Sequence, residues 1–290
     1  MDQANPIDPR IEEVRNSFQK ELNLHGYGFQ FAVLNKARHA VGKGSRWAFK
    51  VIELPVQVQG TGTRIDFVLV RRGATGFPIV MLAECKRANP ALANWCFICA
   101  PISHSKRHKS SEQLIMEKVV LSQDVRGSAE KGLWLERAYQ VGIEVRSKQK
   151  GDVKGETGRA IENAASQVLR GLNGYVEMLE GNRQLLEQHR PIYLLPVVFT
   201  TAGLWVSEAD LFSANVETGE IELNNKDFKE VPWLWYQYHS SPGLKHSRGF
   251  PVQTSKVEEL MDAEYVRTIA IVNSAGIEDF LLQTTEFEFF

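Results

Sequence analysis

Two apolar runs, each interrupted by acidic charge, constrain the fold of this chain more than any other feature. The first run covers residues 63–70 and places Asp66 among β-branched and aromatic residues. The second covers residues 78–86 and ends with Glu84 and Lys86, two positions apart. Such short runs are typical of β-strands, and the glycine-containing segment between them is typical of a turn. The sequence therefore predicts two adjacent antiparallel strands.

This pairing would bring the charged side chains to one place. Side chains alternate between the two faces of a strand, so Glu84 and Lys86 should share one face while Cys85 points to the other. An exposed ion pair at a sheet edge is the more frequent role of such residues. However, Asp66 lies in mid-run and Glu84 follows five apolar residues, which are unusual places for charges without a function.

Two neighbouring carboxylates repel each other unless a cation neutralises them. Their hard oxygen ligands suit Mg²⁺ or Mn²⁺, with waters in the remaining coordination positions. A divalent ion held by Asp66 and Glu84 would bind a phosphate and acidify a water molecule, and Lys86 would orient or deprotonate that water.

These residues resemble the signature of the PD-(D/E)xK nuclease superfamily, in which an acid is followed on the next strand by acid-x-lysine. The matching residues are Ile65-Asp66, with isoleucine in place of proline, and Glu84-Cys85-Lys86. The resemblance implies an α/β, restriction-endonuclease-like core, with a central mixed sheet flanked by helices. It also implies Mg²⁺-dependent DNA cleavage that leaves 5′-phosphate and 3′-hydroxyl ends. The backbone carbonyl of Cys85 would be a further metal ligand.

Two more site residues are implied by the same resemblance. The family usually adds an acid from its first helix, which we expect over residues 8–24, with an apolar stripe facing the sheet. Glu12 is our candidate and Glu21 the alternative. A glutamine on the helix after the acid-x-lysine strand would be Gln167. The exonuclease form has a tyrosine four residues later, but residue 171 is Gly171.

The remaining pattern predicts a nuclease core over residues 1–203 and a C-terminal α+β extension over residues 204–290. Within the core we expect a helix, three strands, a long insertion at 89–155, a helix at 159–180 and a buried parallel strand at 193–201. Less distinct signals suggest helices at 111–123 and 255–265 and a hairpin at 215–223. The aromatic cluster at 233–238 favours core packing over base stacking.

Charge is unevenly distributed although the formal net charge is only −1. Residues 36–50 contain no acid, and their basic residues are candidates for nucleic-acid contact: Lys36, Arg38, Lys43 and Arg46. Ordinary solvated loops are the alternative.

One further metal-binding pattern is weak. Cys96, Cys99, His104 and His108 have residue types that bind zinc, but their spacing does not match a zinc knuckle, and we favour a buried strand.

The whole chain suggests a cytoplasmic protein. No stretch of 18 uninterrupted apolar residues predicts a membrane span, the first residues do not resemble a signal peptide, and three cysteines suggest a reducing compartment.

The apolar residues 287–290 suggest packing against the core or a second subunit, hence a homodimer or larger homo-oligomer. Family analogy suggests a bacterial restriction or anti-phage role. A non-catalytic DNA-binding protein and an effector that needs a partner or small-molecule activator remain open.

Overall fold

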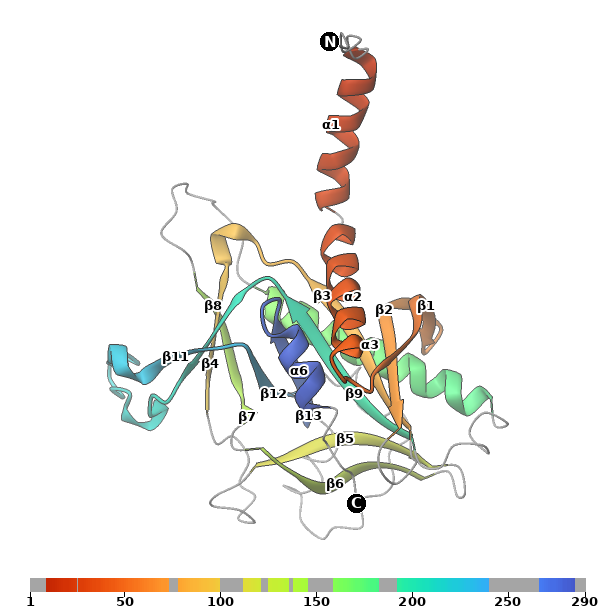
Figure 1. Ribbon diagram of the computed structural model, residues 1–290. Helices are drawn as coiled ribbons and strands as arrows, with labels where there is room; N and C mark the ends of the chain where they lie inside the picture. The colour runs from red at the N-terminus through yellow and green to blue at the C-terminus, as the bar shows by residue number, and fades with distance from the viewer. Residues whose placement is uncertain are drawn as a thin grey trace.

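The computed structural model of the chain describes residues 9–24, 26–72, 78–99, 112–120, 125–135, 138–145, 159–182, 192–239 and 266–284. These residues form an α/β fold around a nine-stranded mixed sheet, with a second sheet of four strands (Figure 1). The predicted class, a central mixed sheet flanked by helices, is confirmed.

The main sheet begins with an antiparallel meander of three strands: β1 (Ala48–Val58), β2 (Thr61–Arg72) and β3 (Pro78–Lys86). β9 (Ile192–Thr200) lies parallel to β3, as predicted, and β13 (Val266–Asn273) lies parallel to β9. The sheet continues through β12 (Trp233–His239) to the short β7 (Ala138–Tyr139). A hairpin of β5 (Glu112–Val120) and β6 (Val125–Leu135) joins the sheet beside β9.

Helices cover both faces of this sheet (Figure 1). On one face, α2 (Tyr27–Gly42) and α6 (Ile277–Gln283) contribute Val33, Leu34, Phe280 and Leu281 to a core cluster with Phe199. On the other face lies α3 (Ala160–Gly181), the crossover between β3 and β9. A further helix, α1 (Pro9–Leu24), projects away from the body.

Glycines allow α3 to approach the β1–β2 hairpin closely. A Cβ atom on Gly171 would lie 2.9 Å from Ile65 Cγ1, and one on Gly174 would lie 2.7 Å from Val56 Cγ2. Real Cβ atoms do not come this close to other carbons, so any larger residue would push the helix outward. Ile65 directly precedes Asp66, which means that α3 packs beside the candidate acid.

The second sheet has the strand order β11 (Phe228–Val231), β10 (Gly203–Ser207), β4 (Asn94–Ile98) and β8 (Val141–Val145). Short 3-10 helices lie at Pro90–Leu92, Leu211–Ser213 and Asn225–Asp227. The insertion at 89–155 therefore supplies strands to both sheets. The segment after residue 203 also belongs to both, because β12 and β13 extend the main sheet.

Several local predictions are wrong. Residues 112–120 form a strand in place of the expected helix, and residues 215–223 form turns in place of a hairpin. The expected helix at 255–265 lies outside the described residues. The aromatic cluster at 233–238 is confirmed as core, since Trp235, Tyr236 and Tyr238 are all buried. Within the described part of the chain, no helix is long and apolar enough to cross a membrane.

Candidate active site

The register of the meander brings three acidic residues together. β2 and β3 pair from Phe67 opposite Ala83, so the next position along the ladder sets Asp66 opposite Glu84. On the other side of β2, the pairs flanking position 66 set Glu53 of β1 opposite Asp66. Asp66 therefore lies between two other carboxylates in the sheet.

The two faces of β3 separate Glu84 and Lys86 from Cys85, as the alternation predicted. Val80 and Leu82 pack in the cluster formed with α3, and Glu84 and Lys86 continue this face of the strand. Cys85 packs against the opposite cluster, beneath α2. Glu84 and Lys86 thus lie on the α3 side of the sheet.

Main-chain contacts fix the carboxylate of Asp66. The backbone N–H of Cys85 donates a hydrogen bond to Asp66 Oδ2 over 2.6 Å, which ties the acid of β2 to the acid-x-lysine segment of β3. A hydrogen bond to a carboxylate favours its charged form. The rest of the environment of Asp66 favours the neutral form of its carboxyl group.

Burial raises the pKa of Asp66 to about 6, assisted by the charge of Glu53, while the Cys85 hydrogen bond and Lys86 lower it. Burial, assisted by the charge of the neighbouring Asp66, raises the pKa of Glu84 to about 8, although Lys86 lowers it. Only 7 % of Glu84 is exposed. Two neighbouring acids, one half-buried and one buried, that resist ionisation favour the binding of a proton or a cation, which fits the chemistry of a hard divalent ion.

Glu53 is a site residue that the sequence analysis missed. It has a positive φ of 52°, near a register shift in β1, and such a backbone is rare outside glycine. Gln30 of α2, only 4 % exposed, donates from Nε2 to Glu53 Oε1 over 2.8 Å and to the backbone oxygen of Asp66 over 2.9 Å. Arg64 Nη1 lies 3.5 Å from Glu53 Oε2. Both oxygens of Glu53 are therefore held in place.

The helix that packs on the sheet is α2, and the expectation for α1 was wrong. Ile11, Val14 and Phe18, which should have faced the sheet, are 62 %, 68 % and 65 % exposed. Glu12 is exposed on the same helix and lies 3.5 Å from Arg15, and Glu21 is exposed as well. Neither glutamate of α1 belongs to the group around Asp66.

Gln167 lies on α3, one turn before Gly171, and its side chain is exposed. Because Gly171 abuts Ile65, this turn of α3 runs toward the strand that carries Asp66. The role of Gln167 stays a prediction.

The basic residues expected to bind nucleic acid lie on or just after α2, away from the α3 face. Lys36 Nζ donates to the backbone oxygen of Ser274 over 2.6 Å, and Lys43 is paired with Glu278 of α6. Arg38 and Arg46 are exposed. Lys36 and Lys43 thus hold α2 against the segment that carries α6, and their expected contact with nucleic acid stays a prediction.

Among the described residues, no three acidic, histidine or cysteine side chains converge closely enough to hold a metal by themselves. A cation at this site would be held by Asp66 and Glu84, with the Cys85 carbonyl and waters completing its coordination. Of the weak zinc pattern, Cys96 lies in β4 and Cys99 packs against a core cluster, while His104 and His108 lie outside the described residues.

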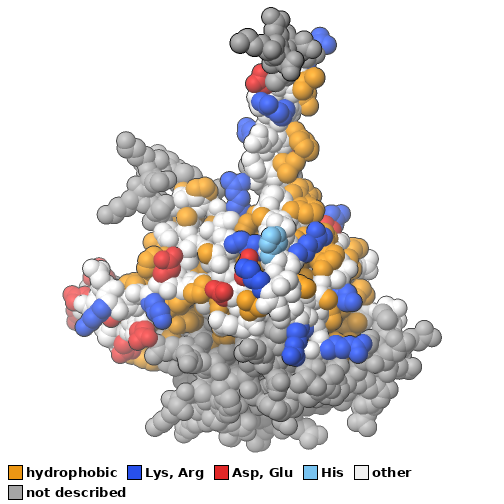
Figure 2. Space-filling model, in the orientation of Figure 1, with side chains coloured by type: hydrophobic (Ala, Val, Ile, Leu, Met, Phe, Trp, Pro, Cys, Tyr) orange, Lys and Arg blue, Asp and Glu red, His pale blue; other side chains and the backbone are white. Residues whose placement is uncertain are grey.

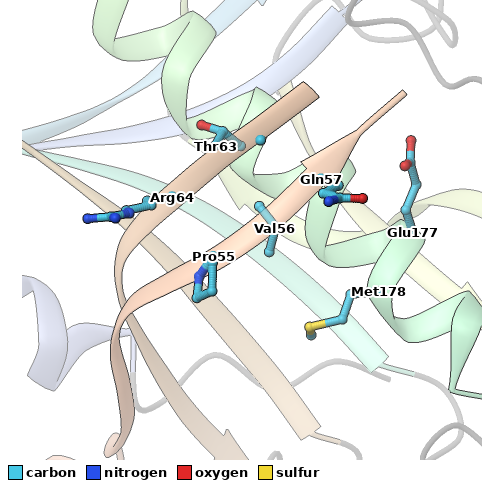
Figure 3. Close-up of a pocket in the computed structure, with 9 residues that line it drawn as sticks. Pro55, Val56, Gln57, Thr63, Arg64, Glu177 and Met178 are labelled. Carbon is cyan, nitrogen blue, oxygen red and sulfur yellow. The ribbon is translucent and has the colours of Figure 1, made fainter. Parts of the chain in front are cut away.

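A hollow of about 730 Å³ lies between the β1–β2 hairpin and α3 (Figure 3). Pro55 and Met178 form part of its apolar wall, and Glu177 accepts a hydrogen bond from the Gln59 backbone. Arg64 lines the hollow two residues before Asp66 and also contacts Glu53. None of the three acids lines the hollow, and the Arg64 side chain points away from Glu177 and Met178 (Figure 3).

Comparison with protein-family models, with curated proteins and with solved structures finds no match to this chain. The functional argument therefore depends on the fold and on the geometry of this site.

Proposed function

We propose that this protein is a Mg²⁺- or Mn²⁺-dependent nuclease that hydrolyses phosphodiester bonds in DNA to 5′-phosphate and 3′-hydroxyl ends. The observation that carries the proposal is the pairing of the half-buried Asp66 with the buried Glu84 beside Lys86, with both carboxyl pKa values raised. Charged groups with perturbed pKa values are concentrated at functional sites. A purely structural ion pair would not require two acids in one buried place.

The element order supports the restriction-endonuclease-like form of this proposal. α2 is followed by the three antiparallel strands β1, β2 and β3 and, after the insertion that contains β4 to β8, by α3 and the parallel strand β9. This is the helix, three strands, helix, strand order that the resemblance implies for such a core. In this reading α2 is the first core helix and α1 precedes the core.

Each residue of the site has a distinct role in this proposal. Asp66 and Glu84 would hold the cation, which when bound supplies positive charge for a phosphate oxygen and for an attacking water. Lys86 shares the face of Glu84 and would accept a proton from that water or neutralise charge on the phosphate. Gln30 and the Cys85 N–H keep Glu53 and Asp66 in fixed positions, so that the carboxylates are arranged before substrate binds.

Cleavage by the purified protein tests the proposal. Single-stranded and duplex DNA and RNA would be incubated with Mg²⁺, Mn²⁺ or EDTA, and the product ends identified by their sensitivity to phosphatase and ligase. We expect metal-dependent cleavage that Asp66→Ala and Glu84→Ala abolish. Glu220→Gln, in an exposed turn of the acidic 215–223 segment, is the matched control and should remain active.

A second candidate is an effector that cuts only when assembled with a partner or activator. The exposed apolar side chains of α1 favour it, because a surface of this kind usually binds another protein. An inactive purified protein that still binds the metal at Asp66 and Glu84 would point to this reading. Metal-independent DNA binding without any cleavage would instead favour a non-catalytic DNA-binding protein.

A further inference from the structure

The apolar side of α1 is the most exposed hydrophobic surface on a helix of the described structure. Ile11, Val14 and Phe18 are each more than 60 % exposed, and Leu22 continues the same line one turn further. Figure 2 shows this stripe along the helix that projects from the body. An isolated helix of this length is marginal in water, so α1 needs packing on its apolar side to persist.

The opposite, polar side of α1 contacts the rest of the chain near the base of the helix. Asn16, Gln19, Lys20 and Asn23 line a hollow of about 440 Å³ against Arg87, the residue that follows Lys86. Arg87 Nη1 donates to the backbone oxygen of Asn23 over 2.5 Å. α1 is thus anchored at its base by polar contacts, and its apolar side is directed away from the chain that carries it.

The charges of α1 exclude two classes of partner. The helix carries three basic residues and three acidic ones, whereas a membrane-surface helix needs an excess of basic residues on its polar face. Nucleic acid is excluded as the partner of the stripe because the stripe itself is uncharged. A protein surface of similar apolar character is what remains.

We propose that the stripe pairs with the same stripe of a second copy of this chain, in an antiparallel, two-fold arrangement. With Val14 opposite Phe18 of the second copy, Ile11 lies opposite Leu22, so that all four apolar residues of each helix meet apolar residues. The stripe is therefore complementary to itself, as a two-fold interface requires.

The charges at the edge of the stripe fit the same arrangement. Arg10 and Glu21 are 11 residues apart, close to three full turns, and so lie on one edge of the stripe. Antiparallel pairing sets Arg10 of each copy near Glu21 of the other copy, so the dimer has two such Arg–Glu contacts. A parallel pair would instead bring this edge against the other edge of the second copy's stripe, which carries Arg15, so that Arg10 would lie near another arginine. The other edge carries Arg15, which already has Glu12 as a neighbour at 3.5 Å.

The interface is small. A helix of 16 residues is about 24 Å long, and two of them bury an area near the lower limit of about 1,000 Å² for a specific interface. We therefore expect a reversible dimer with a dissociation constant in the micromolar range. This dimer does not depend on the nuclease proposal. The residues at 287–290, which first suggested self-association, lie outside the described structure.

Sedimentation equilibrium and light scattering of the full chain from about 1 to 100 μM test the proposal. The wild type should approach about 66 kDa, twice its 32.8 kDa, at high concentration. Val14→Glu with Phe18→Glu should remain a monomer throughout. The matched control is Asn16→Glu with Asn23→Glu, which adds the same two charges on the opposite side of the helix and should dimerise like the wild type.

A charge exchange tests the orientation. Arg10→Glu and Glu21→Arg should each weaken the dimer about tenfold, because each turns two attractions into repulsions, and the double variant should recover it. Circular dichroism of every variant checks that the body remains folded. A monomeric wild type, a dimer that survives the Val14 and Phe18 changes, or a double variant that does not recover would overturn the proposal.

Discussion

Glu84→Gln should stabilise the metal-free protein while destroying the site. The folded-state pKa of Glu84 is raised from 4.5 to about 8, so the folded protein binds a proton more tightly than the unfolded chain does. Between these two pH values the unfolded chain ionises and the folded site does not, and wild-type stability falls as pH rises. At pH 7 the difference corresponds to about 3 kcal/mol, an upper estimate because the site can admit water.

Glutamine has nearly the same shape as glutamate and no charge to bury, so Glu84→Gln avoids this cost. For a chain of this size about 3 kcal/mol corresponds to a rise in melting temperature of roughly 6 to 10 °C. The gain should be largest at pH 8 and should be almost gone at pH 4.5, where the folded glutamate is protonated and the unfolded one is only half ionised. Thermal and urea unfolding in EDTA at pH 4.5, 7 and 8 measure it.

Metal should cancel this difference in stability at pH 7. A cation that binds only the folded wild type at about 100 times its dissociation constant adds about 3 kcal/mol, and Glu84→Gln should gain little of this. Glu220→Gln, which removes an exposed carboxylate, should behave as wild type with and without Mg²⁺. If Glu84→Gln is no more stable than wild type at pH 8, or if its gain is the same at pH 4.5, the buried-charge reasoning is refuted.

Three other predictions concern single residues of the site and its support. Lys86→Ala should slow cleavage at least about a hundredfold, with little change in the Mg²⁺ affinity that calorimetry measures. Near-full activity of Lys86→Arg would show that the lysine acts only through its charge. Glu53→Gln should lower the pKa of Asp66, because the negative charge of Glu53 raises it; NMR titration of the carboxyl carbons measures the shift, and an unchanged or higher value would contradict it. Gly174→Ala should lower the free energy of unfolding in urea by about 1 to 3 kcal/mol, since its Cβ would meet Val56. Gly181→Ala is the control, because its Cβ in the same helix meets nothing within 4 Å, and it should be neutral or stabilising. Equal effects of the two substitutions would contradict the close-packing account.

The meander and its charged residues could be predicted because the information is local. Alternation, length and the mid-strand position of Asp66 identify β2 and β3 without knowledge of the rest of the chain. The position of Glu53 was also accessible, since a turn at Gln59–Gly60 sets residue 53 opposite residue 66 in the hairpin. The positive φ of Glu53 was not accessible, because no glycine or turn residue marks this position of the strand.

The first helix was misassigned for a physical reason. α1 has large apolar residues in a regular stripe, whereas the buried positions of α2 are occupied by Gln30, Val33, Leu34, Ala37 and Ala40. Small residues and one amide give a weak periodic signal, although they allow close packing on the sheet. Which of two amphipathic helices packs on a sheet depends on the rest of the sheet, which local periodicity does not specify. The helix expected at 111–123 failed similarly, because pairing with β9 makes this segment a strand.

The misassignment also explains why the predicted acid of the first helix is missing from the site. α2 occupies the place expected for that helix, but the residue it directs at the acids is Gln30, an amide that donates to Glu53 and to the backbone of Asp66. An acid at position 30 would add another carboxylate beside two whose pKa values are already raised, and would leave the Asp66 carbonyl without its donor. The third carboxylate comes instead from the neighbouring strand as Glu53. Its negative charge raises the pKa of both Asp66 and Glu84, so it strengthens the site's preference for a cation while Gln30 and Arg64 hold its own oxygens.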